Sequence, residues 1–141
     1  MATLSMLHAV DPREDLLKKI GNLDHIDVFS NHVLVATYVR PTTTKSGLIL
    51  TAQTRKEDEY QGKIGLVIKK GPLAFEDDDR NHFKGQNVEI GEWIAYRQSD
   101  GWQLKLGGSV KNFEEADGGW HCRMLQDIDI KMRVSHPDAL L

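Results

Sequence analysis

Short stretches rich in β-branched and aromatic residues, separated by turns that contain glycine, recur along the sequence from residue 32 onward. They are HVLVATYV (32–39), KIGLVIK (63–69), EWIAY (92–96), WQLKL (102–106), WHCRM (120–124) and DIDIKMRV (127–134). Such residues favour β-strands, and many short strands joined by tight turns predict an all-β barrel or sandwich. Because the chain has 141 residues and one cysteine, Cys122, the fold has to rest on a hydrophobic core and not on intrachain disulfides.

One pair of these stretches carries a turn signal. WQLKL alternates apolar and polar side chains and directly follows the sequence SDG. An Asp-Gly pair between two strand-like stretches is typical of a β-hairpin. We therefore expect residues 92–106 to form a hairpin that turns at Asp100 and Gly101.

The stretch DPREDLLKKIG (11–21) predicts a helix near the front of the chain. Asp11 suits the N-cap, Pro12 suits the first helical position, and Gly21 suits the end of the helix. The expected apolar face consists of Leu16, Leu17 and Ile20. This face has to dock on the protein's own sheet or on a neighbouring molecule.

Two long connections, residues 40–61 and 71–86, separate the strand-like stretches. Connections of this length tend to be functional or disordered in compact domains. The first of them contains three adjacent aliphatic residues, Leu48, Ile49 and Leu50, which we call the aliphatic tripeptide. Either the tripeptide is exposed and binds a partner, or it is a buried strand, because periodicity does not distinguish the two for so short a run.

Composition and motifs exclude several classes of function. With 18 basic and 21 acidic residues, the net charge of -3 does not favour nucleic-acid binding. No apolar run is long enough to span a membrane and no signal-peptide pattern opens the chain, so we expect a cytoplasmic protein. TKSG (44–47) lacks the other P-loop glycines, DDDRNH (77–82) lacks the later residues of a calcium loop, and the histidines have no metal-ligand spacing. We expect no catalytic residues, no cofactor and no metal.

Five blocks in order resemble the GroES family of co-chaperonins. HVLVATYV is similar to its first barrel strand, and TKSGLIL is similar to its mobile loop, in which T-K-S and glycine precede an aliphatic tripeptide. QGKIGLVIKKGP, VEIGEWIAY and HCRMLQDIDIKM are similar to the strand-and-turn blocks that follow. The resemblance covers about residues 28–134 and implies a mainly β fold, a GroES-like small β-barrel with an extended mobile loop and a roof loop.

The resemblance also implies a division of the chain. Residues 1–27 are an added N-terminal extension with the short helix, 28–134 form the barrel, and 135–141 form a C-terminal tail. Within the barrel, 40–61 are the mobile loop and 71–86 a roof-like loop. The helix and residues 111–119 are additions to the usual family chain. Longer chains of this kind are similar to co-chaperonins carried by phages and prophages, so we expect a viral version. Since the matching barrel starts later, we expect a chain without residues 1–21 to keep its assembly and binding.

By resemblance, the mobile loop inserts into a groove on the apical domain of a bacterial-type (GroEL-like) chaperonin when nucleotide is bound, and the protein caps the folding chamber. The chaperonin-binding residues would be Lys45, Ser46, Gly47, Leu48, Ile49 and Leu50. The roof loop residues Phe75, Glu76, Asp77, Asp78 and Asp79 would line a central opening, although a plain solvated loop explains them nearly as well.

The family assembles as a ring, so we expect self-association of about seven copies. We expect residues 32–39 of one chain to pair with residues 128–134 of the next, because an exposed strand edge needs a partner. The alternative function is that of a viral structural or assembly protein that reuses the barrel without a chaperonin cycle.

Overall fold

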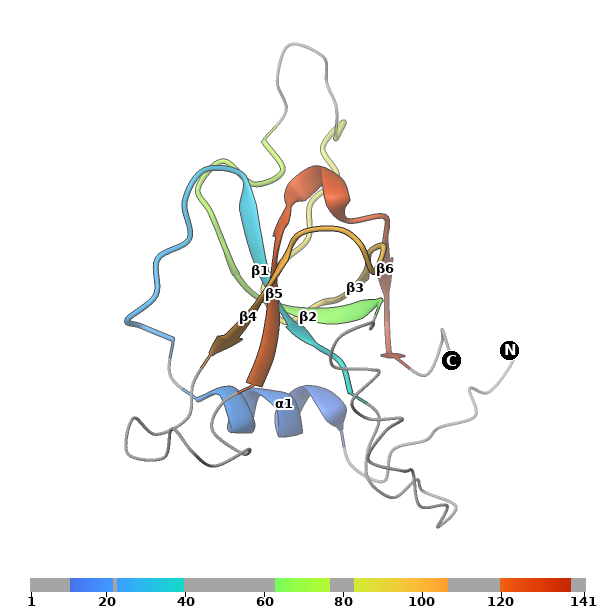
Figure 1. Ribbon diagram of the computed structural model, residues 1–141. Coiled ribbons are helices and arrows are strands. Elements are labelled where there is room, and N and C mark those ends of the chain that lie inside the picture. Colours follow the sequence, from blue (N-terminus) through green and yellow to red (C-terminus); the bar gives the residue numbers. More distant parts are fainter. Residues whose placement is uncertain (1–10, 22, 40–62, 77–82, 107–119, 138–141) are drawn as a thin grey trace, which may run out of the picture.

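The computed structural model describes residues 11–21, 23–39, 63–76, 83–106 and 120–137. This part of the chain contains one α-helix, six strands and a short 3-10 helix (Figure 1). In chain order they are α1 (Pro12–Ile20), β1 (His32–Thr37), β2 (Ile64–Lys70), β3 (Trp93–Ala95), β4 (Trp102–Leu106), β5 (Trp120–Gln126), η2 (Asp127–Asp129) and β6 (Met132–Val134). The prediction of a mainly β fold is confirmed.

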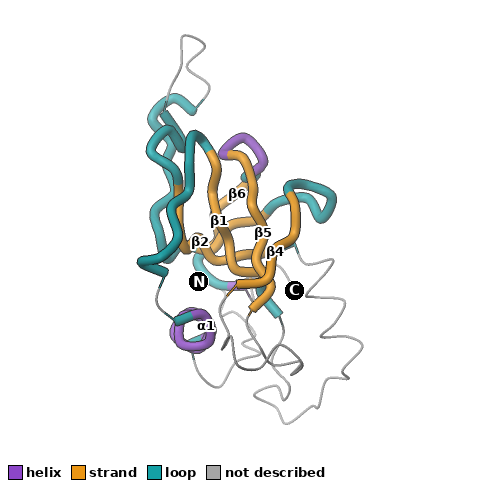
Figure 2. Tube along the Cα trace, turned by 60° about the vertical axis from the view of Figure 1, so that its left-hand side comes forward, coloured by secondary structure: helices purple, strands orange, loops and turns teal. Residues whose placement is uncertain are grey.

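All six strands form one antiparallel sheet in the order β4-β5-β1-β2-β3-β6. The sheet curls strongly, as Figure 2 shows, but among the described residues it is not closed, and β4 and β6 are its outer strands. β1 pairs with β2 on one side and with β5 on the other. The expected pairing of residues 32–39 with a neighbouring chain is therefore wrong, since both edges of β1 are occupied within its own sheet.

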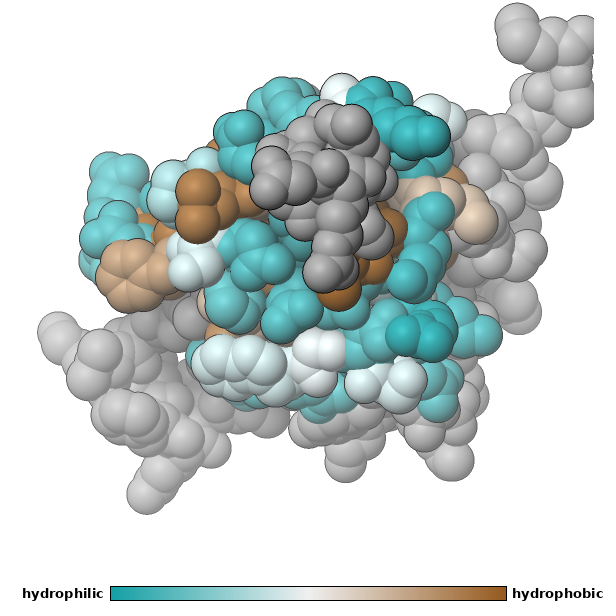
Figure 3. Space-filling model, turned by 90° about the horizontal axis from the view of Figure 1, so that it is seen from above, coloured by the Kyte–Doolittle hydropathy of each residue, from teal (hydrophilic) through white to brown (hydrophobic). Residues whose placement is uncertain are grey.

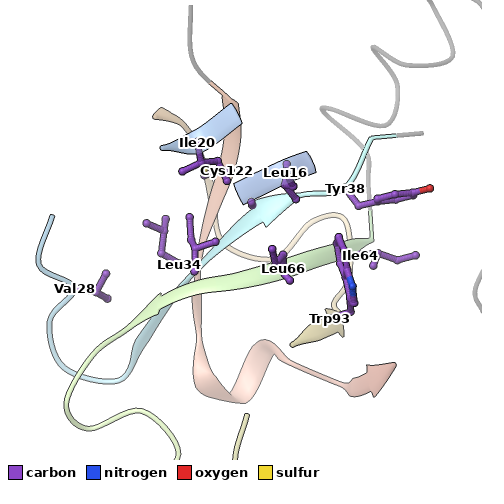
Figure 4. Packing of buried hydrophobic residues seen from close by; sticks show 11 residues of the cluster. Leu16, Ile20, Val28, Leu34, Tyr38, Ile64, Leu66, Trp93 and Cys122 are labelled. Carbon is purple, nitrogen blue, oxygen red and sulfur yellow. The ribbon is translucent and has the colours of Figure 1, made fainter. Parts of the chain in front are cut away.

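The sheet is covered on both faces. Leu34 and Ala36 of β1 belong to one buried cluster, whereas Val33 and Val35 belong to another. Because successive strand residues point to opposite faces, the uninterrupted apolar run of β1 reflects burial on both sides. Figure 4 shows the first of these clusters, which includes Trp93.

The helix packs on this first cluster. Asp11 caps it by accepting a hydrogen bond from the backbone N–H of Arg13 at 3.0 Å. Leu16 and Ile20, one turn apart, are each only 4 % exposed and belong to the same buried cluster as Cys122 and Leu34 of the sheet (Figure 4). Leu17 is 41 % exposed, so the expected three-residue face is reduced to two. Contrary to the expectation from the sequence, removing residues 1–21 would uncover part of the core.

The predicted hairpin over residues 92–106 is wrong. β3 pairs with β2 and β6, and β4 pairs with β5. The segment between β3 and β4 is instead held against β5 by Arg123. The Arg123 guanidinium is buried and donates hydrogen bonds to the carbonyl oxygens of Gln98 and Asp100. A buried cation requires such acceptors, so this long-range contact overrides the local turn signal.

Gly101 is where the segment between β3 and β4 meets β5. It has φ +71°, and a Cβ atom there would lie 2.3 Å from the carbonyl oxygen of Met124. Gly91 has φ +95° but has open space around a Cβ, so it provides a matched control. We expect Gly91→Ala to lower the free energy of unfolding by about 1 kcal/mol through backbone strain alone. Gly101→Ala should cost about 2–3 kcal/mol because strain and a backbone clash add. Denaturant unfolding checks this, and equal costs would contradict it.

Candidate functional site

The two long connections leave opposite ends of the β1–β2 pair. Thr37 pairs with Gly65 at one end, and Val33 pairs with Lys70 at the other. Residues 40–62 therefore start and finish beside the first end, and residues 71–86 beside the second. Strands of this length hold the two ends about 20 Å apart. The described residues that flank the two connections therefore lie at opposite ends of the β1–β2 pair. The roof end can be followed in Figure 1, where residues 71–76 lie at the top.

The root of the first connection is firmly held. The backbone N–H of Tyr38 donates to the carbonyl oxygen of Ile64 at 3.0 Å, which ties the two sides of the connection together. The Tyr38 ring makes an edge contact with Trp93, with 5.8 Å between ring centroids. Trp120 donates from its indole nitrogen to the carbonyl oxygen of Thr37 at 2.9 Å. A rigid root limits how far the two ends of the connection separate.

The sequence-predicted chaperonin-binding residues lie outside the described residues. They are Lys45, Ser46, Gly47, Leu48, Ile49 and Leu50. Their role stays a prediction, and so does the alternative that the aliphatic tripeptide is a buried strand.

The second connection is described on both sides of residues 77–82. We call its described parts, together with the two residues that follow it, the roof base (residues 71–76 and 83–88). Hydrogen bonds from the backbone N–H of Gly71 to the His32 carbonyl (2.8 Å) and of Leu73 to the Ser30 carbonyl (2.9 Å) attach the roof base to the start of β1. The Lys70 ammonium donates to the Val88 carbonyl at 3.0 Å. The roof base is therefore hydrogen-bonded both to the start of β1 and to the end of β2.

Of the five predicted roof loop residues, the structure describes Phe75 and Glu76. Phe75 is partly buried, and its ring makes an edge contact with Phe83, with 5.4 Å between ring centroids. Phe75 thus belongs to the roof base, where it joins the two sides of the loop. Glu76 is exposed, as a loop residue would be, while Asp77, Asp78 and Asp79 lie outside the described residues. Seen from this end, the described surface is mostly hydrophilic, with smaller hydrophobic areas (Figure 3).

Asp127 is a residue whose role sequence reasoning missed. It is 4 % exposed, and its carboxylate accepts hydrogen bonds from the Asn31 side chain (3.1 Å) and from the backbone N–H of Phe75 (3.0 Å). The only signal in the sequence was the DI pair within the block HCRMLQDIDIKM, which carried the resemblance without indicating a function. A groove of about 670 Å³ borders Asp127 and lies between the roof base and β6, where Met132 and Arg133 line it.

The buried ionisable groups of the described sheet are structural. Burial raises the pKa of the Tyr96 hydroxyl, and the nearby Arg123 guanidinium opposes that shift. Tyr96 therefore stays uncharged near neutral pH, and the guanidinium lies over its ring at 5.1 Å from the centroid. The contact is a cation–π interaction and not an ion pair. Within the described residues, no group of three or more His, Cys, Asp or Glu side chains could hold a metal ion. No helix in that part of the chain has the length and apolarity to cross a membrane.

Comparison with known protein families gives a match over residues 25–115 to the family described as Chaperonin 10 Kd subunit. The matched residues are well over half of the chain and include both long connections and strands β1 to β4. The chain belongs to the chaperonin 10 family. A comparison with curated proteins finds none that matches it.

Membership of the chaperonin 10 family confirms the resemblance to GroES-type co-chaperonins and supports a co-chaperonin role. Co-chaperonins of this family are non-enzymatic lids. The match leaves out α1 before residue 25 and β5, η2 and β6 after residue 115. The block HCRMLQDIDIKM, which also resembled the family, thus lies beyond the matched residues.

Proposed function

We propose that the protein is a co-chaperonin that binds the apical domains of a bacterial-type chaperonin in a nucleotide-dependent way and caps its folding chamber. The family match over residues 25–115 carries this proposal, because it includes the whole connection with the sequence TKSGLIL. The layout of the described residues supports it. The root of that connection and the roof base lie at opposite ends of β1 and β2. A lid needs such an arrangement, with one end on the chaperonin and the other over the opening.

The aliphatic tripeptide is the proposed contact with the chaperonin. Burying Leu48, Ile49 and Leu50 in an apolar groove would contribute roughly 1.5–3 kcal/mol for each side chain. Ordering the surrounding loop costs about 1–2 kcal/mol per residue, so a single loop binds weakly. Pro41 and the threonines that follow it restrict the free chain and lower that cost.

Weak contacts of this kind become effective when several are linked, because each further loop binds at a high effective concentration. We therefore propose that the protein acts as a ring. β6 supports this, since it is an outer strand of the described sheet and keeps one edge for a neighbour. A ring also needs a second, different surface on each copy, because its contacts are head-to-tail.

Light scattering on the purified protein tests self-association. We expect a mass of about seven times the 16.0 kDa of one chain at micromolar concentration. A monomer under these conditions would rule out a stable ring and leave the linked-loop explanation of affinity without support.

Co-sedimentation with a bacterial-type chaperonin, with and without nucleotide, tests the proposed function itself. The proposal places the protein in the bacterial cytoplasm beside that partner. An origin in a phage or prophage, with a phage capsid protein as the client, is a further proposal that rests on the added segments at residues 1–27 and 111–119.

A further inference from the structure

Asp127 joins three segments that are far apart in the sequence. Its carboxylate accepts one hydrogen bond from the Asn31 side chain, just before β1, and one from the Phe75 backbone in the roof base. Its own backbone N–H donates to the Asn31 carbonyl at 3.0 Å. Asp127 also begins η2, the short turn that leads into the outer strand β6. One buried side chain thus connects the start of β1, the roof base and the segment before β6.

Phe75 is held in an unfavourable backbone conformation. Its φ angle is +63°, a region that residues with a Cβ atom rarely occupy. Such strain persists only where surrounding contacts enforce it. For Phe75 these contacts are the hydrogen bond from its N–H to Asp127 and the edge contact of its ring with Phe83. The Lys70 ammonium adds a cation–π contact, 5.8 Å from the centroid of the Phe75 ring.

We propose that Asp127 is the positioning residue of the roof base. By accepting the Phe75 N–H, its carboxylate keeps Phe75 in the strained conformation, which places the ring against Phe83 on the other side of the loop. Through Asn31 and η2 the same carboxylate fixes the roof base relative to β1 and β6. This gives a physical role to Asp127, the first residue of the DI pair in the block HCRMLQDIDIKM. The consequence for capping rests on the proposed function, whereas the role of Asp127 in holding the roof base does not.

Hydrogen exchange of the purified full-length protein, followed at individual amides, tests the positioning role. Asp127→Ala removes both acceptors, and we expect exchange of the Phe75 amide to become about tenfold faster or more. The Val35 amide in the centre of β1 reports global unfolding, and its exchange should change much less. Asp129→Ala is the matched control. It alters the same turn, where the Asp129 carboxylate accepts from the Gln126 N–H, but among the described residues the Asp129 side chain makes no hydrogen bond with the roof base. It should leave Phe75 unchanged.

A suppressor pair separates positioning from simple loss of stability. Asn31→Asp places a second carboxylate against Asp127 and should speed Phe75 exchange by repulsion. Adding Asp127→Asn restores both hydrogen bonds, with donor and acceptor exchanged between positions 31 and 127. The new amide nitrogen donates to the carboxylate at position 31, and the new amide oxygen accepts the Phe75 N–H. Exchange should then return to within about threefold of the original protein.

The proposal is overturned if Asp127→Ala leaves Phe75 exchange unchanged, if Val35 exchange rises in parallel, or if the double variant fails to reverse Asn31→Asp. None of these measurements involves a chaperonin. Failure of the proposed function, seen as absence of chaperonin binding by the unaltered protein, is therefore a separate result. If both proposals hold, Asp127→Ala still binds the chaperonin, since residues 40–62 leave the opposite end of β1 and β2.

Discussion

Replacing Leu48, Ile49 and Leu50 together with serine is expected to abolish chaperonin binding while leaving the midpoint of thermal unfolding nearly unchanged. The loss arises because each loop forfeits roughly 1.5–3 kcal/mol per aliphatic side chain. In a ring this loss is multiplied over the linked loops, so even a modest change at each loop removes measurable affinity. Stability is unaffected if the tripeptide is exposed, because little apolar area then leaves the folded core. Co-sedimentation measures chaperonin binding by this variant, and thermal unfolding of the same variant measures its stability.

A matched control uses the same loop and the same number of substitutions. Serine at Thr51, Gln53 and Thr54 changes three neighbouring polar residues and should leave binding and stability close to those of the original protein. If the aliphatic tripeptide is instead a buried strand, each of its substitutions should cost about 2–5 kcal/mol and the triple variant should unfold. Unfolding of that variant would reject the proposed binding site without affecting the family assignment.

Leu16→Ala is expected to lower the free energy of unfolding by about 2–5 kcal/mol, and Ile20→Ala by a similar amount. Both side chains are 4 % exposed and belong to the first buried cluster, which contains Trp93 and Leu34, so truncation leaves cavities between α1 and the sheet. Leu17→Ala is the natural control, since Leu17 is 41 % exposed in the same helix. It should cost about 0.5–1 kcal/mol at most.

Denaturant unfolding of these three variants measures the contribution of α1 directly. A chain that starts after Gly21 should lose soluble protein, because it exposes the surface that Leu16 and Ile20 cover. Equal and small effects of Leu16→Ala and Leu17→Ala would show that the helix is a peripheral addition, as the sequence alone suggested.

Local patterns predicted the elements of this fold well. The apolar runs of β1 and β2 and the N-cap, proline and glycine around α1 each determine structure within a few residues, and these elements formed where expected. The buried face of the helix was predicted only in part, because three apolar residues define a face approximately. Leu17 lies at the margin of that face.

The errors came from contacts between distant residues. The Asp-Gly turn signal at residues 100–101 was overridden by Arg123, and the central place of β1 depended on pairing with β5, which lies far along the chain. The hydrogen bond between Asp127 and Phe75 spans 52 positions, and no local pattern indicates it. For the candidate site, the loop sequence predicts the aliphatic tripeptide as the contact, and the family match over residues 25–115 includes that loop, while the anchoring of the roof base required the structure.

Nucleotide-dependent co-sedimentation with a bacterial-type chaperonin tests the central claim most directly. The unaltered protein, mixed with the chaperonin and ATP or ADP, should appear in the chaperonin fraction, and it should remain in the supernatant when nucleotide is omitted. Binding that is the same with and without nucleotide, or no binding under either condition, would contradict a lid function and favour a structural role for this chaperonin 10 fold.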